Sequence, residues 1–145
     1  MKRFLTIVIL IILITAGLYA YKTYTGKVKT LEDVKAVVTV TATDLIAAFE
    51  KDSAAANKLY LGKVVAVTGN IKSIEKEAGT IVMGNGESMS SVRCSLDSNY
   101  VKKITGLNIG NQIIIKGACT GFNSDELGLG SDVVLNRCVI PPNKY

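Results

Sequence analysis

Three cysteines carry the most reactive side chains of this chain, and they stand at positions 94, 119 and 138. A cysteine needs a neighbouring base or a cluster of cations to act as a nucleophile. The sequence contains no histidine, which excludes Ser–His and Cys–His arrangements and removes the commonest metal ligand. No basic cluster flanks Cys94, Cys119 or Cys138 either, so we predict that none of them is catalytic.

The same cysteines could form a structural disulfide, but the sequence leaves the pairing open. In an exported domain one oxidised pair is plausible, and the third cysteine would stay a thiol or bond to another chain. Cys119 and Cys138 fall on strands expected to form a hairpin, in which a central turn would place Cys119 opposite about position 134. Cys94 competes for Cys138 if their strands are neighbours. Between Val92 and Leu96, Cys94 also fits a buried small apolar residue.

One acidic segment and one pair of glycines have residue types that occur in metal and phosphate sites. Asp125, Glu126 and Asp132 could be read as a calcium loop, but their spacing matches no calcium-ligand pattern, so we interpret them as part of a solvated hairpin loop. Gly84 and Gly86 mark a turn rather than a phosphate-binding loop, because no helix follows them directly. We therefore predict no metal, no cofactor and no enzymatic activity.

The positive charge of the chain belongs to its N-terminal end. The formal net charge is +5, from 17 basic and 12 acidic residues. Residues 1–30 hold no acid but five of the basic residues, namely Lys2, Arg3, Lys22, Lys27 and Lys29. The remaining residues are balanced, so the overall charge gives little support to a nucleic-acid ligand for the folded part.

An apolar run over residues 4–21 follows a basic tail at residues 1–3. At about 1.5 Å per residue, a helix over this run is about 27 Å long, enough to cross a bilayer core. A cleaved signal peptide is the alternative, but Leu18-Tyr19-Ala20 places a bulky leucine where cleavage needs a small residue. We therefore predict an uncleaved transmembrane signal anchor.

The predicted topology puts residues 1–3 in the cytoplasm, because a very short tail before such a run usually stays inside. No cysteine stands near the end of the run, so a lipoprotein anchor is not expected. Residues 22–40 are interpreted as a linker. The expected localisation is a single-pass membrane protein with an extracytoplasmic C-terminal domain.

Two short helices are expected at the start of this domain. Thr41 or Thr43 can cap the first helix, and Asp52 or Ser53 can cap the second, which Gly62 ends. The apolar residues at helical spacing in the first helix are Leu45, Ala48 and Phe49. We interpret the apolar face of these helices as a surface that packs on a sheet.

Alternating apolar residues predict strands after these helices. The first expected strand runs through residues 64–71 and bends near Lys72-Ser73, where the apolar parity changes. Asn85-Gly86 is a strong signal for a two-residue hairpin turn, which would pair Met83 with Ser88 and Ile81 with Ser90. The other strands are expected over residues 80–83, 91–96, 111–121 and 131–140, with a short helix over 99–107.

Three strands, a helix and two more strands, with a bent first strand, is the order of an OB barrel. We therefore predict a mainly β protein, a five-stranded OB-fold barrel (β-β-β-α-β-β) preceded by one or two short α-helices and an N-terminal transmembrane helix. The domain is expected over residues 41–140, and residues 141–145 form a tail.

The apolar, glycine and cysteine pattern also resembles a known family, the small bacterial OB-fold proteins called tRNA-anticodon-binding-like, which often carry an N-terminal anchor or signal. The resemblance implies an OB barrel and brings no enzymatic activity with it. It rests on Tyr60-x-Gly62-Lys63, Val67-x-Gly69, Val92-x-Cys94, Gly110, Gly117-x-Cys119-x-Gly121 and Leu135-x-x-Cys138.

OB barrels usually bind ligands on the face of their second and third strands, here residues 80–83 and 91–96. These strands carry no aromatic residue on which a base could stack. The candidate ligand-binding residues are Lys72, Lys76, Arg93, Lys116 and Phe122. We predict a non-catalytic, membrane-anchored OB-fold binding module that faces the cell envelope, with a protein or an envelope component as its ligand. The alternative is an OB domain that binds an oligonucleotide or a tRNA-like nucleic acid.

Overall fold

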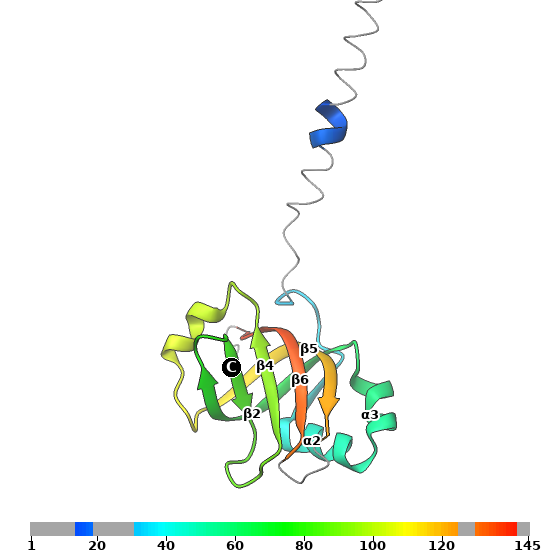
Figure 1. The fold of residues 1–145 in the computed structure, drawn as a ribbon, viewed down its shortest axis with the longest axis vertical. Coiled ribbons are helices and arrows are strands. Elements are labelled where there is room, and N and C mark those ends of the chain that lie inside the picture. The colour runs from blue at the N-terminus through cyan, green and yellow to red at the C-terminus, as the bar shows by residue number, and fades with distance from the viewer. Residues whose placement is uncertain (1–13, 19–30, 125–129, 142–145) are drawn as a thin grey trace, which may run out of the picture.

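The computed structural model describes residues 14–18, 31–124 and 130–141, and it places the second and third of these ranges in a β-barrel with helices at its ends (Figure 1). Residues 14–18 are helical. The elements that follow are β1 (Val38–Thr41), α2 (Ala42–Lys51), α3 (Ser53–Tyr60), β2 (Val64–Glu75), β3 (Thr80–Met83), β4 (Ser91–Leu96), the 3-10 helix η1 (Val101–Gly106), β5 (Gln112–Asn123) and β6 (Asp132–Val139).

Five strands close the barrel in the order β2-β3-β4-β6-β5, and β5 pairs back with β2. The pairing of β4 with β6 is parallel, and the other pairings around the barrel are antiparallel. This arrangement confirms the predicted five-stranded OB-fold barrel. The structure adds β1, which pairs in parallel with β2 and whose residues 38–40 fall in the segment that we interpreted as a linker.

Strand β2 is long because it pairs with two other strands, one after the other along its length. Its first half, Val64 to Asn70, pairs with β5, and its second half, Ile71 to Glu75, pairs with β3. The register shifts between Ile71 and Ser73, which confirms the predicted bend. A bulge there increases the local twist, so one strand can turn the corner of a small barrel.

Helix α2 packs its apolar face on the barrel. Thr41 caps the helix, because its Oγ1 accepts a hydrogen bond from the backbone N–H of Asp44 at 3.1 Å. Leu45 and Phe49 are buried and belong to the barrel core. At Gly69 of β2 the helix comes so close that an added Cβ would lie 2.8 Å from the Cβ of Ala42. Glycine at this position allows the helix and strand to touch.

The connection between β3 and β4 is longer than the sequence suggested. Met83 pairs with Val92 rather than with Ser88, a shift of four residues. The predicted two-residue turn at Asn85-Gly86 is therefore wrong, and the whole segment from Gly84 to Ser90 forms the connection. The prediction of which side chains face the core is still correct, because a register shift by an even number of residues keeps every side chain on the same side of a sheet.

The predicted membrane-spanning segment, residues 4–21, is described by the structure only at residues 14–18. Its other residues lie outside the described part of the chain. Within residues 14–18, 31–124 and 130–141, no helix has the length and apolarity needed to cross a membrane. On this finding, the predicted transmembrane helix is not supported, and the predicted localisation as a single-pass membrane protein is wrong.

Candidate ligand-binding face

The outer face of β3 and β4 is built from small side chains. Ser73, Val82, Arg93 and Val134 stand beside one another across β2, β3, β4 and β6. Val82 is only 6% exposed although it points away from the core residue Ile81 next to it. The outer side chains that flank this row on β3 and β4 are those of Thr80, Ser91 and Ser95. Thr80 and Ser91 are buried, at 7% and 5% exposed, so the accessible hydroxyl groups of this face are those of Ser73 and Ser95, and the face has no aromatic platform.

The one arginine of this face is already paired. Arg93 on β4 reaches over β3 to Glu75 on β2, and its Nη2 donates to both carboxylate oxygens at 2.8 and 3.1 Å. Both side chains remain about two-fifths exposed. The pair is therefore accessible to a ligand, but the guanidinium charge is balanced.

Two of the predicted lysines are engaged within the domain. Lys72 Nζ donates to the carbonyl of Ser88 at 2.6 Å, which ties β2 to the β3–β4 connection. Lys116 Nζ donates to the carbonyls of Glu32 and Val34 at 2.6 and 2.8 Å. Lys116 thus fastens the segment before β1 to β5 rather than joining the β3–β4 face. Lys76, which follows β2, is exposed.

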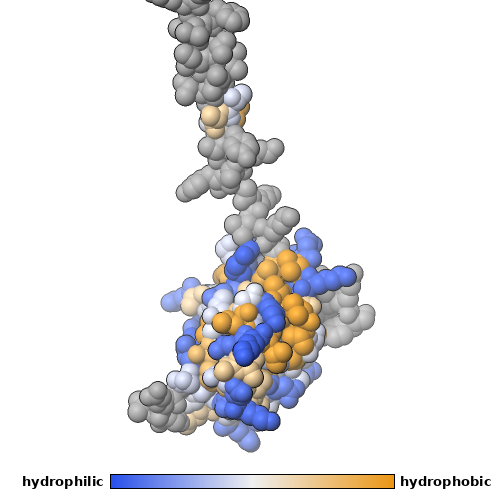
Figure 2. Space-filling view, turned by 90° about the vertical axis from the view of Figure 1, so that its right-hand side faces the viewer, coloured by the Kyte–Doolittle hydropathy of each residue, from blue (hydrophilic) through white to orange (hydrophobic). Residues whose placement is uncertain are grey.

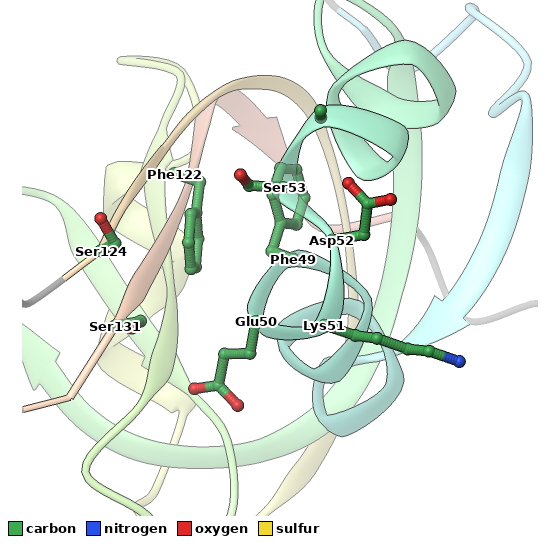
Figure 3. Close-up of a pocket in the computed structure, with 9 residues that line it drawn as sticks. Phe49, Glu50, Lys51, Asp52, Ser53, Phe122, Ser124 and Ser131 are labelled. Carbon is green, nitrogen blue, oxygen red and sulfur yellow. The ribbon is translucent and has the colours of Figure 1, made fainter.

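Phe122, the predicted aromatic residue, stacks inside the domain. Its ring centroid lies 5.0 Å from that of Phe49 on α2, at an interplanar angle of 21°. The two rings form one wall of an open pocket of about 560 Å³ between the end of α2, the start of α3, the end of β5 and the start of β6 (Figure 3). The other residues that line this pocket are Glu50, Lys51, Asp52, Ser53, Ala54, Ser124 and Ser131.

The charges around this pocket disfavour phosphate. Glu50 and Asp52 provide two carboxylates against the single ammonium of Lys51. Glu50 Oε1 accepts a hydrogen bond from Ser90 Oγ at 2.6 Å, and Asp52 caps α3 by accepting from the backbone N–H of Ala55 at 2.9 Å. Polyanions are repelled by such an acidic rim. The pocket suits a ligand that donates hydrogen bonds or carries positive charge.

The three cysteines are buried in the core as free thiols. Burial raises the pKa of the Cys119 thiol. The pKa of Cys138 is raised above its usual range by its hydrogen bond with Cys94, with burial as the second cause. Raised pKa values keep Cys119 and Cys138 protonated at neutral pH, so the environment does not activate them as nucleophiles.

The acidic segment has no metal-binding arrangement in the part that the structure describes. Residues 14–18, 31–124 and 130–141 contain no group of three or more His, Cys, Asp or Glu side chains placed to hold an ion. Asp132 accepts a hydrogen bond from Ser91 Oγ. Asp125 and Glu126 lie outside the described residues.

The structure thus separates the predicted ligand-binding residues. Lys72, Lys76 and Arg93 belong to the side of the barrel formed by β2, β3 and β4, whereas Lys116 and Phe122 lie on β5 and contact other segments. Hydrophilic side chains are spread around the domain, with an apolar area near the point where the chain enters it (Figure 2). Sequence reasoning missed Glu75, whose role depends on the register of three strands.

Comparisons with known proteins agree with the barrel. A search of curated proteins found no match. Among solved structures, the chain resembles a candidate nucleic acid-binding lipoprotein from Klebsiella pneumoniae at 18% identity, with a TM-score of 0.52 over 71% of this chain and 91% of the other.

Two weaker structural matches are parts of larger enzymes. One is an asparaginyl-tRNA synthetase from Entamoeba histolytica, at 13% identity and a TM-score of 0.44, over 76% of this chain and 25% of that enzyme. The other is a candidate aspartyl-tRNA synthetase from Leishmania major, at 9% identity and a TM-score of 0.43, over 90% of this chain and 27% of the other. The model of the tRNA_anti-like family matches residues 1–139, and the chain therefore belongs to the tRNA_anti-like family of OB-fold domains.

Proposed function

We propose that this domain is a non-catalytic binding module that takes a protein segment on the outer face of β3 and β4. The observation that carries the proposal is the ion pair of Arg93 with Glu75 at 2.8 Å. A face with paired charges and hydroxyl groups matches a polar peptide, which offers both donors and acceptors. The small, partly exposed side chains of Ser73 and Ser95 let the backbone of an extended peptide approach the strands.

A nucleic acid fits this face less well. Affinity for phosphates comes from cations that release counterions, and Arg93 is already balanced by Glu75. Stacking of bases contributes about 1–3 kcal/mol each on exposed aromatic rings. The aromatic residue at the rim, Phe122, stacks on Phe49.

A single-stranded nucleic acid is nevertheless the second candidate. The name of the family and that of the Klebsiella protein both favour it. In this case Arg93 would exchange Glu75 for a phosphate, and the exposed Lys76 would add a second contact. The two candidate ligands predict different effects on nucleic-acid affinity when the negative charge of Glu75 is removed.

Fluorescence anisotropy with the full chain separates the candidates. Labelled single-stranded DNA and tRNA are titrated from about 20 to 200 mM salt, a range over which phosphate contacts weaken strongly. We expect flat curves for the wild type and for Glu75→Gln. Two results together would make nucleic acid the proposed ligand in place of protein. The first is a dissociation constant below about 10 μM that rises with salt, and the second is a lower dissociation constant for Glu75→Gln than for the wild type.

Site-specific photo-crosslinking tests the protein ligand directly. A photoreactive residue in place of Ser95, on the face, is compared with one in place of Lys58, which is exposed on α3. We expect position 95 to give a discrete protein adduct that Arg93→Glu abolishes, and position 58 to give none. Equal adducts from both positions, or no adduct from position 95, would overturn the proposal.

A further inference from the structure

A short chain of hydrogen bonds holds the carboxylate of Glu50 at the pocket beside Phe49 and Phe122. The backbone N–H of Ser131, just before β6, donates to Ser90 Oγ at 3.1 Å. The hydroxyl of Ser90, a residue only 7% exposed, donates in turn to Glu50 Oε1 at 2.6 Å. Because the middle residue of this chain is buried, the Glu50 carboxylate has a fixed position relative to the start of β6.

The negative charge of this pocket is not balanced by a neighbouring cation. Within the part of the chain that the structure describes, no lysine or arginine forms a salt bridge with Glu50 or Asp52. Lys51 also lines the pocket, but its side chain points away from it (Figure 3). Glu50 is exposed, so its second carboxylate oxygen can accept a hydrogen bond from a ligand. The pocket therefore presents a positioned negative charge to the solvent.

The two phenylalanines give the pocket an apolar wall next to this charge. Phe49 is buried, whereas Phe122 keeps part of its ring exposed. Alkyl chains pack on such surfaces while their charged ends stay with polar groups. The pocket, of about 560 Å³, is also large enough for a small ligand, since such sites usually measure about 300–1,000 Å³. A cation carried on an alkyl chain matches both parts of the pocket.

The hydrogen bond from Ser90 favours an ammonium over a guanidinium. A guanidinium binds a carboxylate best through two parallel hydrogen bonds, one to each oxygen. Here Ser90 already donates to Oε1 of Glu50. An ammonium is a compact charge that needs only the remaining oxygen, and its other N–H groups can turn towards neighbouring oxygens. Ser124 and Ser131, which line the same pocket, carry hydroxyl oxygens of this kind.

We propose that this pocket binds a primary ammonium group carried on an alkyl chain, as in a polyamine or a lysine side chain. The ammonium donates to the carboxylate of Glu50, which Ser90 positions, and the alkyl chain packs against Phe122. Asp52 adds negative charge at the rim. The pocket shares no lining residue with the face that carries Arg93, so this inference does not depend on the proposed function.

Fluorine NMR of the full chain tests this site. The chain has three phenylalanines, so 4-fluorophenylalanine gives three signals, and Phe122→Leu assigns the one at position 122. Spermidine and N-acetyl-lysine amide are the ammonium probes. N-acetyl-arginine amide carries a guanidinium instead, and N-acetyl-norleucine amide has an uncharged alkyl chain. We expect saturable shifts of the position 122 signal with both ammonium probes, and weaker binding of the arginine and norleucine probes. The tighter of the two ammonium probes identifies the source of the ligand.

Matched variants separate binding at Glu50 from a general attraction of cations. Glu50→Gln should weaken binding of both ammonium probes about tenfold, because a hydrogen bond to a charged group is lost. Ser90→Ala should weaken it less, since the carboxylate remains but is no longer held in place. Glu87→Gln removes the same charge from an exposed residue that does not line the pocket, and it should have little effect.

Four results would overturn the proposal. They are the absence of a saturable shift at position 122 with either ammonium probe, equal effects of Glu50→Gln and Glu87→Gln, equal binding of the lysine and norleucine probes, and tighter binding of the arginine probe than of the lysine probe. Since Glu50 is exposed, its replacement by glutamine leaves the barrel core intact, and the comparison does not depend on a variant that fails to fold.

Discussion

Arg93 on β4 passes over β3 to Glu75 on β2, and its Nη2 lies 2.8 Å from the nearer carboxylate oxygen. The contact joins two strands that do not pair with each other at this position. It sits at the centre of the proposed binding face. Its accessibility makes it more important for ligand choice than for stability.

Removal of this pair should change stability little. Both side chains are about two-fifths exposed, and exposed ion pairs contribute about 0–1 kcal/mol. We expect Glu75→Ala to lower the unfolding free energy by less than about 1 kcal/mol in urea denaturation. Glu77→Ala, which changes an exposed neighbouring acid, is the control. A loss of several kcal/mol for Glu75→Ala alone would show that the pair holds the barrel together.

Gly69 is where α2 and the barrel touch, so a methyl group there should be costly. The new Cβ would lie 2.8 Å from the Cβ of Ala42, and overpacking of this kind costs about 1–3 kcal/mol. We expect Gly69→Ala to lower the urea midpoint accordingly. Gly86→Ala should be nearly neutral, because nothing lies within 4 Å of a Cβ added there. Equal stability of the two variants would contradict the close contact.

Gly117 and Cys138 should be energetically coupled. Gly117→Ala places a methyl group 2.5 Å from the Cys138 sulfur, and we expect a destabilisation of about 1–3 kcal/mol. Cys138→Ala removes that sulfur, so the double variant should be more stable than the sum of the two single effects predicts. A double-mutant cycle measures this coupling, which is typically about 0.5–3 kcal/mol for residues in contact. Strict additivity would mean that the two residues do not compete for the same space.

Tyr100 should make the domain sensitive to alkaline pH. Its hydroxyl donates to the carboxylate of Glu32, and this bond, followed by burial, raises the pKa of Tyr100 from 10.0 to about 12. The folded state therefore holds the proton more tightly than the unfolded state. The stabilisation is fully present below about pH 10 and is lost as the pH rises towards 12.

The test compares unfolding free energies of the wild type and Tyr100→Phe from pH 8 to 12. The difference between the two proteins should shrink above pH 10, since only the wild type gives up this proton. Other groups that titrate in this range affect both proteins and cancel. A difference that stays constant up to pH 12 would show that Glu32 does not hold the tyrosine proton.

Local patterns in the sequence were enough to predict much of the fold. Apolar alternation located all five barrel strands, and the change of parity after Ile71 located the bulge in β2. Each helix cap was narrowed to two neighbouring candidates, of which Thr41 and Asp52 are the caps in the structure, because a cap depends on residues only three positions away. The family resemblance rested on the same kind of information, since the spacing of apolar, glycine and cysteine residues follows from strand geometry.

The partners of individual side chains were decided only by the tertiary structure. The register of β3 with β4 depends on the whole closed barrel, and a glycine-containing turn signal could not supply it. The lysines and the arginine chosen as ligand-binding residues looked alike in the sequence, yet Lys72, Arg93 and Lys116 each contact a different distant segment. Likewise, the left-handed conformation of Arg137 and the space beside Gly117 on the neighbouring strand decide where the Cys138 sulfur lies in the core. Such contacts join residues far apart in the chain, so no local pattern records them.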